Sequence, residues 1–211
     1  FDKGSMGYDS NSTLQSEVMN TMLSFFFNEF KKSDDDILLL DLGCGTGETS
    51  KKISEMIPIK SIHLLDILKK MIEKSKEKFE HDNVKFYTKD FDYFNDFKNY
   101  NLIISNMAMH WSNNCQDLLQ KILHSMQKNT SLIFSFPTSV SFSDSSKLGN
   151  SFTNNFPQID KLEYVLNNKN FYYKRIEKKY DQHFDNLLEF FKNLKLIGAN
   201  VSNKATTSLQ S

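Results

Sequence analysis

The stretch of sequence that decides the fold runs from Ile37 to Gly47 and reads ILLLDLGCGTG. Its first half, Ile37–Leu42, is a nearly continuous apolar run, which is typical of a strand buried in a parallel sheet. Three of only seven glycines in the 211-residue chain then fall within five residues, at Gly43, Gly45 and Gly47. Glycines where a buried strand turns into a helix let the backbone approach a ligand closely. The stretch therefore predicts a nucleotide-type ligand at this turn.

The spacing of the glycines separates the kinds of site that such a turn can form. A dinucleotide fingerprint would require glycine at Glu48, and a P-loop would end in Gly-Lys-Ser/Thr, which the stretch lacks. What remains is an acid, Asp41, two residues before Gly-x-Gly-x-Gly. This arrangement resembles motif I of the class I S-adenosylmethionine-dependent methyltransferases. A glycine-rich turn without a ligand is the alternative interpretation.

Outward from this stretch, apolar strands alternate with helical periodicity as far as Pro137. The predicted strands that follow Ile37–Leu42 are Ser61–Asp66, Val84–Thr88, Asn101–Asn106 and Ser131–Pro137. The predicted helices are Gly47–Ile57, Leu68–Glu80, a short piece at Phe91–Phe97, and Cys115–Gln127. Such alternation predicts an α/β fold with a Rossmann-like, doubly wound, mostly parallel sheet.

The flanks of this core predict one domain over residues 1–211, with no second core. Residues 1–32 form an N-terminal arm with a helix from Ser12 to Lys32, and residues 37–137 form the cofactor-binding core. Residues 138–211 hold a lid and C-terminal elements. These elements are a serine-rich loop or lid at Thr138–Ser151, a helix at Ile159–Asn168, a strand at Phe171–Phe184 and a helix at Asn186–Gly198.

Composition excludes several classes of protein. The 26 basic and 26 acidic residues cancel, which argues against a protein that coats nucleic acid. No apolar run approaches the ~18 residues of a membrane span. Two cysteines suit a reducing cytoplasm rather than a disulfide framework, and the histidines and cysteines show no metal-ligand spacing.

Acids and amides at the ends of the predicted strands are the best candidates for cofactor contacts. Asp66 can accept both hydroxyls of a ribose, although helix N-capping is the alternative. In the methyltransferases that motif I resembles, an acid placed like Asp90 meets adenine. Asn106 and Met107 would face the methionine end, and His110 beside the only tryptophan is a structural or a catalytic residue. The predicted cofactor-binding set is Asp41, Gly43, Cys44, Gly45, Gly47, Asp66, Ile67, Met71, Asp90, Phe91, Asn106 and Met107.

Three further segments narrow the resemblance. They are Phe1–Gln15, which contains Tyr8-Asp9; Ser105–Trp111; and Leu194–Asn200. Together they resemble the malonyl-[acyl-carrier-protein] O-methyltransferases of biotin synthesis. The resemblance implies methyl transfer from S-adenosylmethionine to the free carboxylate of malonyl-acyl carrier protein. The loop after the fifth strand departs from the family because it lacks glycines.

A carboxylate acceptor has a pKa of ~4 and needs no general base at neutral pH. One cation or donor set must receive it, and the candidates are Tyr8, Arg175 and Lys195. A basic cluster is the predicted docking face for the acidic carrier, or else a solvated face: Lys169, Lys174, Arg175, Lys178 and Lys179. Other interpretations that stay open are another small-molecule methyltransferase, a related arginine hydroxylase and a cofactor-binding scaffold without turnover.

Overall fold

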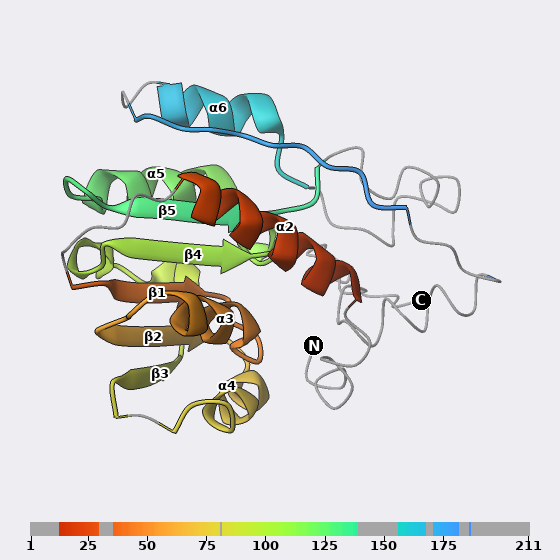
Figure 1. The fold of residues 1–211 in the computed structure, drawn as a ribbon. Coiled ribbons are helices and arrows are strands. Elements are labelled where there is room, and N and C mark those ends of the chain that lie inside the picture. The colour runs from red at the N-terminus through yellow and green to blue at the C-terminus, as the bar shows by residue number, and fades with distance from the viewer. Residues whose placement is uncertain are drawn as a thin grey trace, which may run out of the picture.

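The computed structural model describes residues 13–29, 36–80, 82–138, 156–167, 171–181 and 186. Five parallel strands form one sheet in the order β3-β2-β1-β4-β5 (Figure 1). The strands are β1 (Leu38–Leu42), β2 (Ser61–Asp66), β3 (Val84–Thr88), β4 (Leu102–Asn106) and β5 (Ser131–Ser135). Strand order reverses direction beside β1, so the carboxyl ends of β1 and β4 border the crevice in which such sheets bind ligands. The predicted α/β fold is confirmed.

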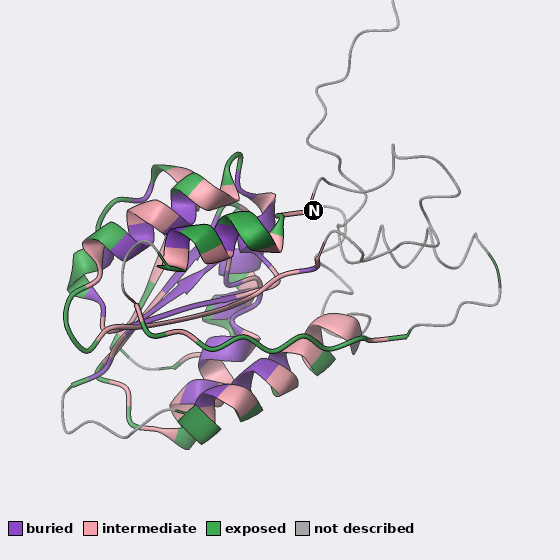
Figure 2. Cartoon of the chain, turned by 90° about the horizontal axis from the view of Figure 1, so that it is seen from above, coloured by how far each residue is buried: buried purple, intermediate pink, exposed green. Residues whose placement is uncertain are grey.

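Helices cover both faces of this sheet (Figure 1). One face carries α2 (Thr13–Glu29), α3 (Glu48–Met56) and α4 (Lys69–Lys76), and the other carries α5 (Cys115–Ser125) and α6 (Ile159–Asn167). Successive residues of a strand point to opposite faces, so Leu39 packs in the core under α2 and α3 while Leu40 packs in the core under α5 and α6. Buried residues accordingly gather between the two layers of helices (Figure 2).

Helix α2 matters most for the site, because it brings the amino-terminal part of the chain onto the sheet. Its buried side is formed by Met19, Met22, Leu23 and Phe26. These residues share a core with Leu39 and with apolar residues of β4, and α2 also contacts β5. The face over β4 and β5 is thereby closed by a segment that precedes both strands by more than 70 residues.

The described ends of the elements differ from the predicted ones by at most four residues, and β2 and β3 have the predicted bounds. Two predictions need correction. The short helical piece at Phe91–Phe97 is two separate 3-10 turns, η2 (Phe91–Tyr93) and η3 (Phe97–Asn99). The predicted strand Phe171–Phe184 is wrong over its described part: residues 171–181 are extended but pair with no strand of the sheet. Periodicity alone does not distinguish an extended segment from a strand, because a strand also needs a partner.

Several predicted segments lie outside the described residues: the arm before Thr13, almost all of the loop Thr138–Ser151 and the helix Asn186–Gly198 beyond its first residue. Within the described part of the chain, no helix is long and apolar enough to cross a membrane. Among the same residues, no group of His, Cys, Asp or Glu side chains is placed to hold a metal ion.

Candidate active site

The loop after β1 is shaped by its three glycines, all of which have left-handed backbone, with φ of 69°, 55° and 80° at Gly43, Gly45 and Gly47. The N–H groups of Gly43 and Cys44 both donate to the carbonyl of Leu65, at 2.8 and 3.0 Å. A Cβ on Gly43 would lie only 2.4 Å from the Cβ of Ala108. Glycine is required here because the φ is costly for other residues and because no space exists for a side chain.

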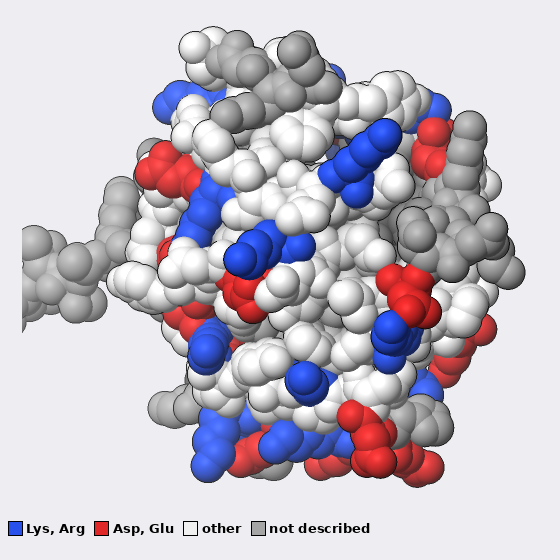
Figure 3. Space-filling model, turned by 90° about the vertical axis from the view of Figure 1, so that its left-hand side faces the viewer, with Lys and Arg blue, Asp and Glu red and all other residues white. Residues whose placement is uncertain are grey.

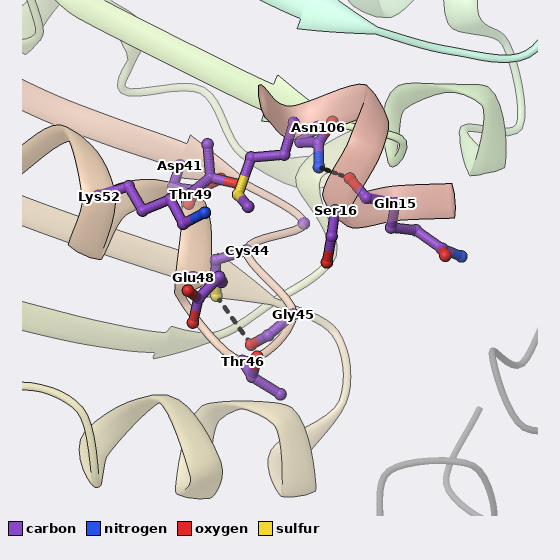
Figure 4. Close-up of a pocket in the computed structure, with 12 residues that line it drawn as sticks. Gln15, Ser16, Asp41, Cys44, Gly45, Thr46, Glu48, Thr49, Lys52 and Asn106 are labelled. Carbon is purple, nitrogen blue, oxygen red and sulfur yellow. Dashed lines mark hydrogen bonds between the residues drawn. The ribbon is translucent and has the colours of Figure 1, made fainter. Parts of the chain in front are cut away.

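A cavity of about 210 Å³ opens beside this loop (Figure 4). It is lined by α2, by α3, by the glycine loop and by the carboxyl ends of β1 and β4. The lining residues are Gln15, Ser16, Met19, Asp41, Gly43, Cys44, Gly45, Thr46, Glu48, Thr49, Lys52 and Asn106. Five members of the predicted cofactor set therefore meet at one cavity, namely Asp41, Gly43, Cys44, Gly45 and Asn106.

Seven lining residues were not predicted from the sequence. Three of them adjoin the glycines in the loop and the first turn of α3: Thr46, Glu48 and Thr49. That position in the sequence could have predicted that they line the site. Lys78, in the turn after α4, holds this part of the loop by donating to Thr46 Oγ1 at 3.0 Å and to Glu48 Oε2 at 2.9 Å. The remaining four come from α2 and the middle of α3: Gln15, Ser16, Met19 and Lys52. Only tertiary packing brings the α2 residues there.

Asp41 is the most deeply buried acid of the cavity, with 1% of its surface exposed. Ser50 Oγ donates to its Oδ2 at 2.6 Å. Burial, and to a smaller extent the nearby charge of Asp66, raise the pKa of Asp41 to about 7, against the lowering effect of the hydrogen bond from Ser50. A buried carboxylate in this state favours a positively charged ligand group, which would hold it ionised.

Asp66 ends β2 and is 8% exposed. Its Oδ2 accepts from the N–H of Gly45 at 2.9 Å and its Oδ1 from the N–H of Leu68 at 2.8 Å. Burial raises the pKa of Asp66, while these backbone hydrogen bonds lower it. The residue thus fixes the glycine loop and the start of α4 together, and each oxygen retains a second lone pair for a ligand. Ile67, beside it, is an apolar side chain with 62% of its surface exposed.

The remaining predicted cofactor contacts lie around this crevice but do not line the cavity. Asp90 Oδ1 accepts from the N–H of Asp92 at 2.8 Å, which caps η2. The ring of Phe91 comes within 3.5 Å of the position that a Cβ on Gly43 would take. Met71 is 3% exposed inside α4, so the structure buries it in packing.

Asn106 ends β4 under α2, and Met107 follows it. Asn106 Oδ1 accepts from Ser135 Oγ at 2.7 Å, and its Nδ2 donates to the carbonyl of Gln15 at 3.3 Å (Figure 4). Met107 has a left-handed φ of 52°, and its N–H donates to the carbonyl of Ser135 at 3.0 Å. Asn106 therefore joins β5, β4 and α2 at the edge of the cavity, and a strained backbone follows it.

His110 lies in the 3-10 turn η4 (Met109–Trp111) and is 7% exposed. Its ring contacts those of Trp111 and Phe156, with centroids 5.1 and 5.8 Å away. Its Nδ1 is buried and has no hydrogen-bond partner in the described part of the structure. Burial lowers the pKa of His110 to about 4, so the ring is neutral at neutral pH.

The predicted acceptor-binding residues are not brought together at the cavity by the described structure. Tyr8 and Lys195 lie outside the described residues. Arg175 lies on the extended segment 171–181, where its Nη1 is 3.3 Å from Oε1 of Glu163 on α6. The proposed docking lysines of this segment also have partners on the same chain.

These partners tie the segment to its surroundings. Lys174 pairs with Glu29 of α2, and Lys179 pairs with Asp181 at 2.9 Å. Lys178 Nζ donates to Thr21 Oγ1 of α2 at 3.3 Å. Lys169 lies outside the described residues.

Residues 33–192 match the model of a methyltransferase-domain family. The chain belongs to the class I S-adenosylmethionine-dependent methyltransferases. Malonyl-[acyl-carrier protein] O-methyltransferase 1 of Ilyobacter polytropus is 30% identical over 97% of this chain and 78% of that protein. The corresponding Priestia megaterium enzyme is 27% identical over 97% and 81%.

Solved structures agree on the fold. A methyltransferase in complex with the Haloferax volcanii Trm112 activator superimposes with a TM-score of 0.60 at 12% identity, covering 78% of this chain and 76% of that one. The magnesium protoporphyrin IX methyltransferase of Synechocystis, solved with bound S-adenosylmethionine, gives 0.57 at 15% identity, covering 81% and 74%.

The residues at the crevice of this methyltransferase fit S-adenosylmethionine. The three glycines of the loop after β1 leave its backbone open to the ligand. Asp66 offers carboxylate oxygens to a ribose diol, and Asp41 offers negative charge to the cationic methionine end. The exposed Ile67 and the ring of Phe91 offer apolar surface to a base.

Proposed function

We propose that this methyltransferase esterifies the free carboxylate of a malonyl group carried on acyl carrier protein. The observation that carries the proposal is similarity over 97% of the chain to proteins of that name, which the chain covers to 78% and 81% of their own lengths. Similarity of this extent includes the segments outside the cofactor-binding core, where a methyltransferase selects its acceptor.

Methyl transfer to a carboxylate requires no general base from the protein. A malonyl carboxylate is ionised at neutral pH, with a pKa of ~4. When bound, S-adenosylmethionine supplies an activated methyl group on a positively charged sulfur. The chain contributes position: alignment of the reacting groups can supply about 7–11 kcal/mol of the barrier. His110, neutral with a pKa of about 4, fits a packing role in this scheme.

We infer which part of the cofactor or acceptor each residue binds from its position in the structure. Asp66 holds the ribose, Asp90 the adenine, and Asp41 the cationic end, while Asn106 and α2 cover the cavity from water. Tyr8, Arg175 and Lys195 are proposed to bind the acceptor carboxylate. Arg175 would have to share or release Glu163, which lies 3.3 Å away.

A turnover assay with S-adenosylmethionine and either malonyl- or acetyl-loaded carrier protein tests the acceptor. We expect a methyl ester on the malonyl carrier alone, because the acetyl group has no free carboxylate. Methylation of neither carrier, with S-adenosylhomocysteine still bound, would contradict the acceptor but leave the family intact. An Arg175→Gln variant should raise the KM for a small malonyl thioester, in which no carrier has to dock, whereas Lys179→Gln, on the same segment, should leave that KM unchanged and serves as the matched control.

We further propose that the carrier protein docks on the basic cluster of Lys169, Lys174, Arg175, Lys178 and Lys179. An acidic partner needs a local cationic face, since the chain as a whole has no net charge. The end of the molecule at the amino ends of the strands shows basic and acidic side chains interspersed (Figure 3), so that view offers no such face.

Reversing Lys178 and Lys179 to Glu tests the docking face, because Lys178 donates to the hydroxyl of Thr21 and Lys179 pairs with Asp181 of its own segment. The KM for malonyl-carrier protein should rise and its salt dependence should flatten, because rim charges mainly govern encounter. Activity on a small malonyl thioester should hardly change. Equal losses on both substrates would mean that the lysines support the fold or the site instead.

A further inference from the structure

Asp92 lies in the middle of the turn η2 and uses every polar group it has. Its N–H donates to Asp90 Oδ1 at 2.8 Å, and its carbonyl accepts from Lys121 Nζ at 2.8 Å. Its side-chain Oδ1 accepts from Ser112 Oγ, and Oδ2 accepts both the N–H and the Nδ2 of Asn113, each at 2.8 Å. Five hydrogen bonds converge on one half-buried residue.

The partners of this carboxylate belong to the segment that joins η4 to α5. Ser112 Oγ also accepts from the N–H of Asn114 at 3.2 Å. Asn114 Oδ1 in turn caps α5 by accepting from the N–H groups of its first turn. Lys121 on the same helix returns to the carbonyl of Asp92. The hydrogen bonds therefore form a closed ring through η2, the 112–114 turn and α5.

This ring holds together the two segments that flank the glycine loop. A Cβ on Gly43 would meet Phe91, on the side of η2, at 3.5 Å and Ala108, on the side of η4, at 2.4 Å. Phe91 stands directly before Asp92, and Ala108 stands four residues before Ser112. The ring of hydrogen bonds through Asp92 thus sets the distance between the two segments around the loop, although Asp92 itself does not line the cavity.

We propose that Asp92 is a positioning residue for the cofactor: its carboxylate holds η2, which Asp90 caps, in register with the turn that carries His110 and keeps Phe91 against the glycine loop. A binding site whose walls are fixed before the ligand arrives loses less entropy on binding. The proposal rests on cofactor binding by this family and not on the identity of the acceptor. The result of the malonyl assay therefore does not affect it.

The test is the Kd of S-adenosylhomocysteine, and separately of adenosine, for Asp92→Asn measured by calorimetry. Asparagine has the same size, but its NH₂ replaces one carboxylate oxygen that accepts from Ser112 or Asn113. One side of the ring of hydrogen bonds therefore loses its acceptor. We expect both dissociation constants to rise by a similar factor of about tenfold, since an adenosine-side wall is lost. Asp96→Asn is the matched control: Asp96 is an exposed acid four residues further on, bonded to Asn99, and its variant should bind as the parent does.

A smaller change in the same ring of hydrogen bonds separates positioning from general destabilisation. In Asn113→Ala the carboxylate of Asp92 keeps its bonds from Ser112 Oγ and from the backbone N–H of residue 113, and it loses only the bond from the Asn113 side chain. We expect this variant to lose a smaller part of the affinity than Asp92→Asn does. An unchanged Kd in Asp92→Asn, with or without a lower melting temperature, would overturn the proposal. So would an equal loss of affinity in the Asp96→Asn control, or a larger loss in Asn113→Ala than in Asp92→Asn.

Discussion

The loop after β1 and the extended segment 171–181 are held in the molecule by different means. In the loop, backbone N–H groups of consecutive residues find fixed acceptors at Leu65 and Asp66 inside the fold. In the segment, no ladder hydrogen bonds to the sheet exist over the described residues. Side chains attach it: polar contacts reach Glu29 and Thr21 of α2 and Glu163 of α6, and Phe171 packs against the core.

The different attachment of the loop and the segment indicates which of the two is more rigid. Buried hydrogen bonds cost about 1–3 kcal/mol each when one partner is removed, so the loop has one arrangement. Exposed ion pairs contribute about 0–1 kcal/mol, so the segment is attached weakly by comparison. The cofactor side of the site is therefore fixed by the fold, and the side proposed for the acceptor rests on contacts that a partner can displace.

Gly43→Ala should have the largest effect. The left-handed φ and the 2.4 Å approach to Ala108 each cost about 1–3 kcal/mol, and urea unfolding measures their sum. In Gly43→Ala/Ala108→Gly the close contact disappears and only the backbone cost should remain. A Gly43→Ala variant as stable as the parent would break the comparison, since the loop would then tolerate change as the segment does.

Asp66→Ala should weaken S-adenosylhomocysteine binding by about 2–4 kcal/mol, because two charge-assisted hydrogen bonds to the ribose are lost. Calorimetry measures the change. Asp66→Asn keeps an acceptor oxygen and should lose less. Unchanged affinity in the alanine variant would remove Asp66 from the cofactor site and leave it as the anchor of Gly45 and Leu68 only.

His110 makes stability depend on pH at the buried side of the site. Burial lowers its pKa to about 4 from 6.5, so between these values the folded state binds fewer protons than the unfolded state. Stability from this residue is therefore lost as pH falls from about 6.5 to about 4, by about 2–3 kcal/mol. Urea unfolding of His110→Gln across this range should show a correspondingly smaller loss. Parallel curves for variant and parent would mean that His110 is solvated in the folded protein.

Tyr180→Phe should have the smallest effect. It removes the hydrogen bond from Tyr180 Oη to Thr21 Oγ1, 2.7 Å long and only partly buried, and should cost about 1 kcal/mol or less of unfolding free energy. Hydrogen exchange should show faster exchange confined to residues 171–181. A loss comparable to that of Gly43→Ala would mean that the segment is as firmly integrated as the loop.

Sequence reasoning succeeded where the signal is local. Each of the five core strands is where its apolar run predicted it, within two residues at either end. Asp41 and Asn106 line the same cavity because carboxyl ends of parallel strands share one edge. The failures are Phe171–Phe184 as a strand and Phe91–Phe97 as one helical piece. In both segments, the secondary structure depends on which groups from distant parts of the chain are available for hydrogen bonds.

By itself, the sequence determined the alternation of strands and helices, the left-handed loop and the acids beside it. Each of these follows from a residue's own φ preference or from apolar periodicity within a few positions. Tertiary structure alone decided that α2 covers the cavity, that Asp92 joins η2 to the 112–114 turn, and that residues 171–181 stay off the sheet. These features depend on contacts between residues that are 20 to about 160 positions apart. No local pattern encodes them, because their stability arises only when the surrounding core has placed both partners.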